Sequence, residues 1–100
     1  MLDRRLLLHD VLKNICPNVY FNPPESVKLI YPCILYKRSV GNTTYADNGP
    51  YVFKVNYQIT IIDKDPDSEL IKKVGMLPGC RYDRHYKAEN MNHDVFDIYF

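Results

Sequence analysis

The chain has 100 residues, of which 46% are hydrophobic and 25% are charged, and its formal net charge is +1. This length fits one domain, and the composition is typical of a folded chain and argues against disorder. A dedicated nucleic-acid-binding protein is usually basic, because contacts to phosphate supply much of its affinity, so the near-zero charge argues against that class without excluding a local basic patch.

Cysteine usage and the N-terminal sequence favour a reducing compartment. The cysteines are odd in number, at Cys16, Cys33 and Cys80, and no two have CxxC spacing. A structural zinc site needs about four paired ligands, so we expect buried free thiols and neither a metal nor another cofactor. The apolar run at residues 6–8 is too short for a signal peptide, and no segment reaches the roughly 18 apolar residues of a membrane span.

The first predicted element is a helix over residues 2–15, which Pro17 ends. Its apolar stripe recurs at helical spacing and consists of Leu8, Val11, Leu12 and Ile15. Short strands are predicted at 19–21 and 33–38, and the proline pair Pro23-Pro24 predicts an extended linker between them.

Residues 39–50 differ in kind from the rest of the chain, because they are polar and poor in aliphatic side chains. A loop of this length inside a small domain is uncommon and often functional, although a solvated hairpin tip is the alternative interpretation. Aromatic residues here have no core to join, and tyrosine is enriched at protein interfaces. We therefore take as interface candidates Arg38, Tyr45, Asp47, Asn48 and Tyr51.

The second half of the chain predicts a strand, a helix and two closing strands. The strongest strand pattern covers residues 53–61, where hydrophobic and polar residues alternate and Tyr57 falls on the buried face. The helix that follows is expected to have Asp65 as its N-cap, Pro66 at its first position and Gly75 as a left-handed cap. Alternating patterns then predict closing strands at 80–87 and 95–100, with a turn over 89–92.

This order of elements predicts a single α+β domain over residues 1–100. We expect a mainly antiparallel sheet of four to five strands with two helices packed on one face, in the order α-β-β-β-α-β-β.

No residue pattern points to catalysis, and we expect the chain not to be an enzyme. His9, His85 and His93 read as surface histidines, and no nucleophile elbow or Gly-rich phosphate loop is present. Alternating acids superficially like those of a calcium-binding loop occur at Asp63, Asp65 and Asp67. The glycine and glutamate that such a loop requires are missing, so helix capping explains these acids better.

Two stretches carry a resemblance to a known family. These are PPESVKLIYPCILYKRS (23–39) and the pairing of TIIDKDPDSEL (60–70) with DRHYKAENMNHDVFDIYF (83–100). Together with the element order, they resemble small tail-completion proteins of long-tailed bacteriophages, and most closely the tail terminator, also called the tail-to-head joining protein.

The resemblance implies a structural role in the tail or neck of a virion assembled in the bacterial cytoplasm. Subunits of that family form a ring, typically a hexamer, which caps the tail tube and meets the connector of the filled head. The implied partners are further copies of the chain, the major tail tube protein and a head-completion or connector protein, with DNA passing through the lumen without sequence-specific binding. The resemblance identifies no individual site residue. A head-completion or neck-stopper role would also predict a ring on the end of a tube or connector.

The alternative from another class is a small nucleic-acid-binding module. Exposed tyrosines on the sheet would stack on bases, and the cations would be Arg81, Arg84 and Lys87.

Overall fold

A computed structural model describes residues 4–39, 44–45 and 53–100, with the backbone alone for 44–45 and 53–54. The α+β class and its element order are confirmed. The helices are α1 (Arg4–Ile15) and α2 (Glu69–Gly75). The strands are β1 (Val19–Phe21), β2 (Cys33–Arg38), β3 (Thr44–Tyr45), β4 (Phe53–Lys54), β5 (Asn56–Asp63), β6 (Cys80–Ala88) and β7 (Met91–Tyr99).

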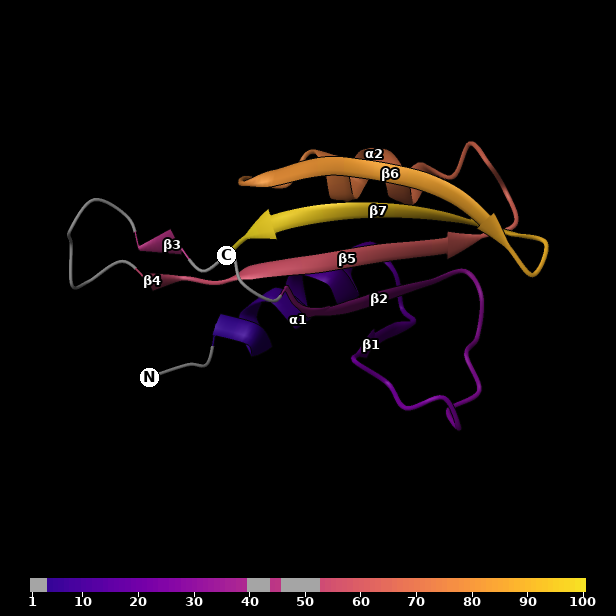
Figure 1. The fold of residues 1–100 in the computed structure, drawn as a ribbon, viewed down its shortest axis with the longest axis horizontal. Helices are drawn as coiled ribbons and strands as arrows, with labels where there is room; N and C mark the ends of the chain where they lie inside the picture. The colour runs from indigo at the N-terminus through magenta and orange to yellow at the C-terminus, as the bar shows by residue number, and fades with distance from the viewer. Residues whose placement is uncertain (1–3, 40–43, 46–52) are drawn as a thin grey trace.

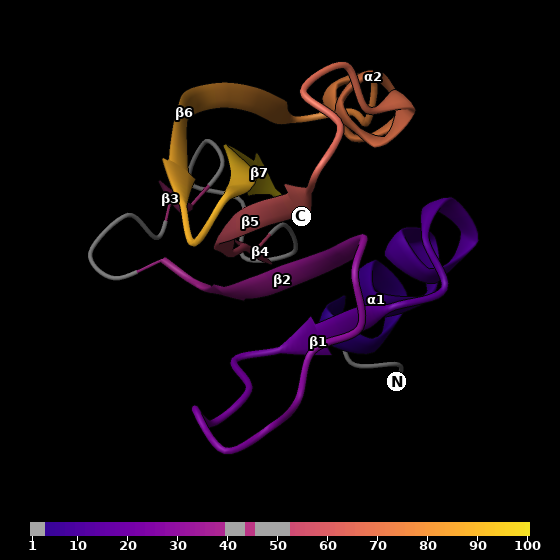
Figure 2. The same cartoon turned by 90° about the vertical axis from the view of Figure 1, so that its right-hand side faces the viewer.

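Five strands form one sheet in the order β1-β2-β5-β7-β6, and β3 and β4 form a separate two-stranded ladder (Figure 1). All neighbours in the large sheet are antiparallel except β1 and β2, which run parallel. Both helices lie on one face of the sheet, as predicted (Figure 2). The sheet bends away from the helices, so its other face is concave, and we call this the outer face (Figure 2).

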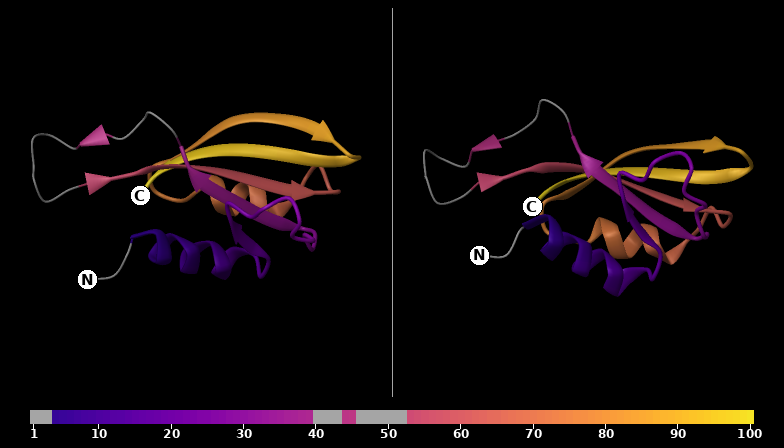
Figure 3. Two further views of the ribbon diagram at one scale, coloured as in Figure 1. Left: turned by 60° about the horizontal axis from the view of Figure 1, so that its bottom comes forward. Right: turned by 90° about the horizontal axis from the view of Figure 1, so that it is seen from below.

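The main core fills the space between the helices and the inner face of the sheet (Figure 3). Along β2, β5 and β7, side chains at every second position point inward, and those of Tyr57 and Ile59 on β5 are at most 2% exposed. Leu8 and Leu12 from α1 and Val74 from α2 are completely buried against them. Tyr57 therefore belongs to the core, as the alternating pattern predicted.

Polar contacts between α1 and β2 accompany this packing. The Nδ1 atom of His9 and the hydroxyl of Tyr36 share a hydrogen bond of 2.7 Å, and Arg5 Nη1 donates to the same hydroxyl at 3.4 Å. Because Tyr36 is only 1% exposed, its hydroxyl needs such partners. Burial raises the pKa of Tyr36, and the hydrogen bond and positive charge of Arg5 oppose that increase.

The start of α2 differs from the prediction. The helix begins at Glu69, and its N-cap is Ser68, whose Oγ accepts from Leu70 N at 3.3 Å. Asp65 instead accepts from the backbone N–H of Asp67 at 2.9 Å, two residues ahead. This side-chain turn competes with helix formation, so the chain turns before the helix begins.

The end of α2 also differs from the prediction, because Gly75 is the last helical residue and not a left-handed cap. Met76 closes the helix with an ordinary right-handed conformation, and its N–H bonds back to Lys72 and Val74 carbonyls. The left-handed glycine is Gly79, with φ of 77°, immediately before β6. The predicted conformation was therefore assigned to the wrong glycine of the two.

Strand boundaries shift in two places. Val55 separates β4 from β5, and β5 runs to Asp63, two residues beyond the predicted end. The last turn contains two residues where four were predicted, because Glu89 and Asn90 both take positive φ, of 53° and 64°. Positive φ at both central residues is the feature of a tight hairpin turn, so β7 begins at Met91 and not at residue 95.

A β-bulge interrupts the alternation predicted for β6. The register shifts between Tyr82, opposite Phe96, and Arg84, opposite Val95. Tyr82 therefore shares the inner face with Phe96, and their rings meet edge to face at 5.1 Å. Arg84 lies on the outer face instead of following Tyr82 inward.

Candidate functional site

The structure places only part of the predicted interface set. Arg38 is exposed at the end of β2. Tyr45 belongs to β3, for which the backbone alone is described. The other three candidates, Asp47, Asn48 and Tyr51, lie outside the described residues.

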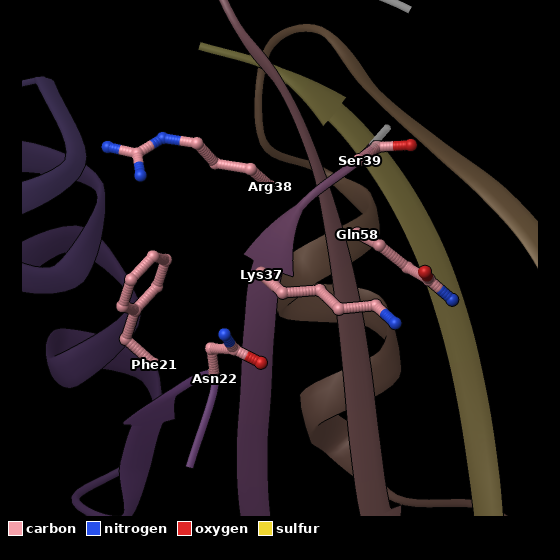
Figure 4. Close-up of a pocket in the computed structure, with 6 residues that line it drawn as sticks. All are labelled: Phe21, Asn22, Lys37, Arg38, Ser39 and Gln58. Carbon is pink, nitrogen blue, oxygen red and sulfur yellow. The ribbon is translucent and has the colours of Figure 1, made fainter. Parts of the chain in front are cut away.

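Arg38 borders a hollow of about 510 Å³ at the edge of the sheet (Figure 4). The hollow is lined by Phe21, Asn22, Lys37, Arg38, Ser39 and Gln58, and we call it the β2 hollow. It exists because β1 has only three residues and its pairing with β2 ends at Tyr36. Asn22 then takes positive φ, of 41°, and its N–H bonds to the Tyr36 carbonyl as the chain leaves the sheet.

The two cations of the β2 hollow lie on opposite faces of β2. Arg38 points toward α1, above the ring of Phe21, and Lys37 lies beside Gln58 on the outer face (Figure 4). The guanidinium carbon of Arg38 is 5.7 Å from the centroid of the Phe21 ring, and that of Arg5 is 4.6 Å from it. Cation–π attraction of this kind holds a guanidinium in place without neutralising its charge.

The β2 hollow is electropositive in the described part of the chain. There, Asp83 and Arg84 form the one ion pair, and neither Lys37 nor Arg38 is paired with a described carboxylate. Lys37 and Arg38 are both exposed. An anionic group that enters the hollow would therefore meet charges that are available for binding.

A second hollow of about 340 Å³ continues along the concave outer face, and Lys37 and Gln58 line both. It extends to Arg84 and Tyr86 on β6. The ring of Tyr86 stacks on that of His93, with centroids 4.7 Å apart, and Arg84 lies 6.0 Å from the Tyr86 centroid.

This outer surface contains only some of the residues predicted for nucleic-acid binding. Arg84 and Tyr86 line the second hollow, and Arg81, which lies opposite Asp97, shares their face but is not part of the lining. Lys87 follows Tyr86 on the strand and so belongs to the other face. Sequence reasoning did not select Lys37 or Gln58; their position opposite each other follows from the β2–β5 register.

The described cysteines are free, and two of the three are buried. Burial raises the pKa of Cys33 to about 12 and that of Cys80 to about 11, so both thiols are protonated at neutral pH. Within residues 4–39, 44–45 and 53–100, no group of three or more His, Cys, Asp or Glu side chains could hold a metal ion.

Neither described helix is long and apolar enough to cross a bilayer. Comparison with protein-family models, with curated proteins and with solved structures finds no match to this chain.

Proposed function

We propose that this chain is a tail-terminator-type assembly protein of a long-tailed bacteriophage. In this role its copies form a ring, expected to be a hexamer, that caps the tail tube and ends its polymerisation. The ring then provides the surface that joins the tail to the connector of the head, and DNA passes through its lumen. The resemblance of residues 23–39, 60–70 and 83–100 to that family supports the proposal. One feature of the fold supports it most directly.

That feature is the β3–β4 ladder, which projects beyond the end of the five-stranded sheet (Figure 1). We call it the arm. Thr44 lies opposite Lys54 and Tyr45 opposite Phe53, and neither strand joins the large sheet. A two-stranded ladder is marginally stable on its own in water, so an arm of this kind gains stability by packing on another surface. A neighbouring subunit or the tail tube would supply that surface.

The position of the arm is compatible with a ring. It lies at one end of the sheet, and the two sheet edges differ in length, since β1 has three residues and β6 has nine. A contact between an arm and a different patch on the next copy is heterologous, and contacts of this type form a ring when the rotation between copies closes and an open filament when it does not. The exposed β6 edge is a poorer contact, because its bulge and its charged residues protect it from pairing.

A variant without the arm tests the proposal. Replacing residues 40–55 by Asn-Gly should close β2 directly onto β5, because Ser39 N already donates to Asn56 O at 2.8 Å. We expect wild type to form a ring-sized species, alone or on purified tail tubes, and the armless variant to remain a folded monomer. Light scattering over a concentration series and negative-stain images of the tubes would measure both.

Val55→Ala is the matched control, because the replacement also removes Val55, which packs against the main core. The control should lose some stability and keep assembly. A wild-type chain that stays monomeric at every concentration and leaves tube ends bare would contradict the proposal.

A nucleic-acid-binding module is the second candidate, and the outer face favours it. Lys37, Arg84 and the exposed Tyr86 line one concave surface there, which suits an aromatic base and its phosphate. Binding to a single-stranded oligonucleotide that weakens steeply with salt, and is lost in Arg84→Gln/Tyr86→Ala, would support this function instead.

A further inference from the structure

Two segments of opposite charge lie at opposite ends of the sheet. The β2–β5 register places Arg38 opposite Tyr57 near the arm, whereas Asp63 lies at the other end of β5, opposite Asn92 of β7. Lys37 and Arg38 therefore mark a basic end. The connection from β5 to α2, residues 63–69, leaves the sheet at the far end, and we call it the acidic connection.

The acidic connection presents its charges to solvent in an ordered form. Its acids are Asp63, Asp65, Asp67 and Glu69, against the single cation Lys64. Asp63 Oδ1 accepts from Asp65 N at 3.0 Å, and Asp65 Oδ1 accepts from Asp67 N at 2.9 Å. These bonds fix the backbone while the second oxygen of each carboxylate stays available, and no described cation forms an ion pair with these acids.

We propose that the acidic connection of one copy docks in the β2 hollow of the next copy. This inference deepens the proposed ring and rests on it. In the docked pair, carboxylates of Asp65 and Asp67 meet Lys37 and Arg38, and the Phe21 ring holds Arg38 in position. Charge-assisted hydrogen bonds between guanidinium and carboxylate are short and directional, so the contact also fixes the angle between subunits.

Charge complementarity selects a second copy as the occupant over a nucleic acid. The hollow is basic, but the molecule as a whole has a net charge of only +1, and the acidic connection at its far end would repel phosphate. The same far end carries the anions that the hollow lacks. The arm projects from the basic end, so a neighbour docked there would also lie beside the arm, and both features would serve one heterologous interface (Figure 1).

Two variants that each disable one end test the inference. Lys37→Gln/Arg38→Gln removes the charge of the hollow, and Asp65→Asn/Asp67→Asn removes charge from the connection while asparagine preserves its turns. Each variant alone should self-associate at least about tenfold more weakly than wild type. Mixed together, they should form a complex of one copy of each, because one intact acidic connection then meets one intact hollow.

That one-to-one complex is specific to a head-to-tail contact. It should dissociate as ionic strength rises toward about 1 M, where charges are screened within about 3 Å. A chain with both ends reversed, Lys37→Glu/Arg38→Glu with Asp65→Lys/Asp67→Lys, should self-associate again. Lys72→Gln/Lys73→Gln removes the same charge from α2 and should leave assembly unchanged.

The outcomes separate this inference from the proposed function. Rings that form normally in both neutralised variants overturn the inference and leave the terminator role standing. A one-to-one complex combined with bare tube ends supports the docking and overturns the terminator role. Oligonucleotide binding by wild type that is lost in Lys37→Gln/Arg38→Gln, without any complex between the variants, would assign the hollow to nucleic acid and also overturn the inference.

Discussion

Two glycines near the start of β6 face opposite constraints. Gly79 has φ of 77°, and a Cβ atom there would lie 2.8 Å from the backbone oxygen of Tyr99. Gly75 is helical, and a Cβ atom there would lie 3.5 Å from Cε2 of Phe96, an ordinary contact. Backbone conformation and space therefore require glycine at one position and not at the other.

The same substitution should thus have opposite effects at the two sites. Gly79→Ala should lower the free energy of unfolding by about 2 kcal/mol, through strain and the contact with Tyr99. Gly75→Ala should raise it by about 0.5–1 kcal/mol, because alanine is the better helix former. Urea denaturation of the two variants measures both, and equal effects would show that the left-handed conformation is not what matters at Gly79.

Tyr82 provides a second prediction for single residues. Its hydroxyl donates to Asp94 Oδ1 at 2.9 Å, and Asp94 is only 5% exposed. Tyr82→Phe should cost about 1–2 kcal/mol, because it leaves a buried carboxylate without this donor. Tyr86→Phe is the control and should change stability by less than about 0.5 kcal/mol, since no hydrogen bond of the Tyr86 hydroxyl is found in the described part of the chain.

The same pair predicts a pH dependence. Desolvation, together with the hydrogen bond and negative charge of Asp94, raises the pKa of Tyr82. The folded state therefore holds the phenolic proton more tightly than the unfolded state, in which the pKa of tyrosine is about 10. Stability from this group is complete below about pH 10 and is lost as pH rises further. Thermal melts from pH 8 to 11 should show a shallower decline in Tyr82→Phe than in wild type.

At the scale of elements, the docking of α1 depends on one stripe of side chains. Leu12 is completely buried against the sheet, whereas Leu6, on the same helix, is 48% exposed. Their helix propensities are equal, so a comparison isolates the contribution of packing.

Leu12→Ala should therefore lower the free energy of unfolding by about 2–5 kcal/mol, because it removes buried methyl groups and leaves a cavity. Leu6→Ala should change it by less than about 0.5 kcal/mol. Chemical denaturation with far-UV circular dichroism measures the difference. Similar losses in both variants would mean that α1 packs in solution on a different face.

At the scale of the whole molecule, ring formation would couple stability to concentration. A species that assembles only when folded is stabilised by mass action, so its melting temperature rises with protein concentration. We expect such a rise for wild type over a hundredfold range of concentration, and none for the armless variant. Calorimetry at several concentrations measures it, and a constant wild-type melting temperature would argue that the free chain does not assemble without a tail tube.

Much of the fold follows from local patterns in the sequence. Alternation along β5 and β7 places Tyr57, Ile59 and Phe96 in the core, and helical spacing places Leu8 and Leu12 there. These patterns have periods of 2 and 3.6 residues, so they are visible within a few residues of each other. Errors arose at boundaries, where Ser68 replaced Asp65 as the cap and a two-residue turn replaced a longer one, because local hydrogen bonds and φ angles decide such positions.

The sequence by itself therefore determined the fold class, both helices and the faces that β5 and β7 bury. Only the tertiary structure decided that β1 runs parallel to β2, which brings Phe21 and Lys37 to the rim of one hollow. The same holds for the bulge that separates Tyr82 from Arg84. Pairing between distant strands depends on loop closure and on packing across the sheet, and neither produces a periodic pattern in the sequence.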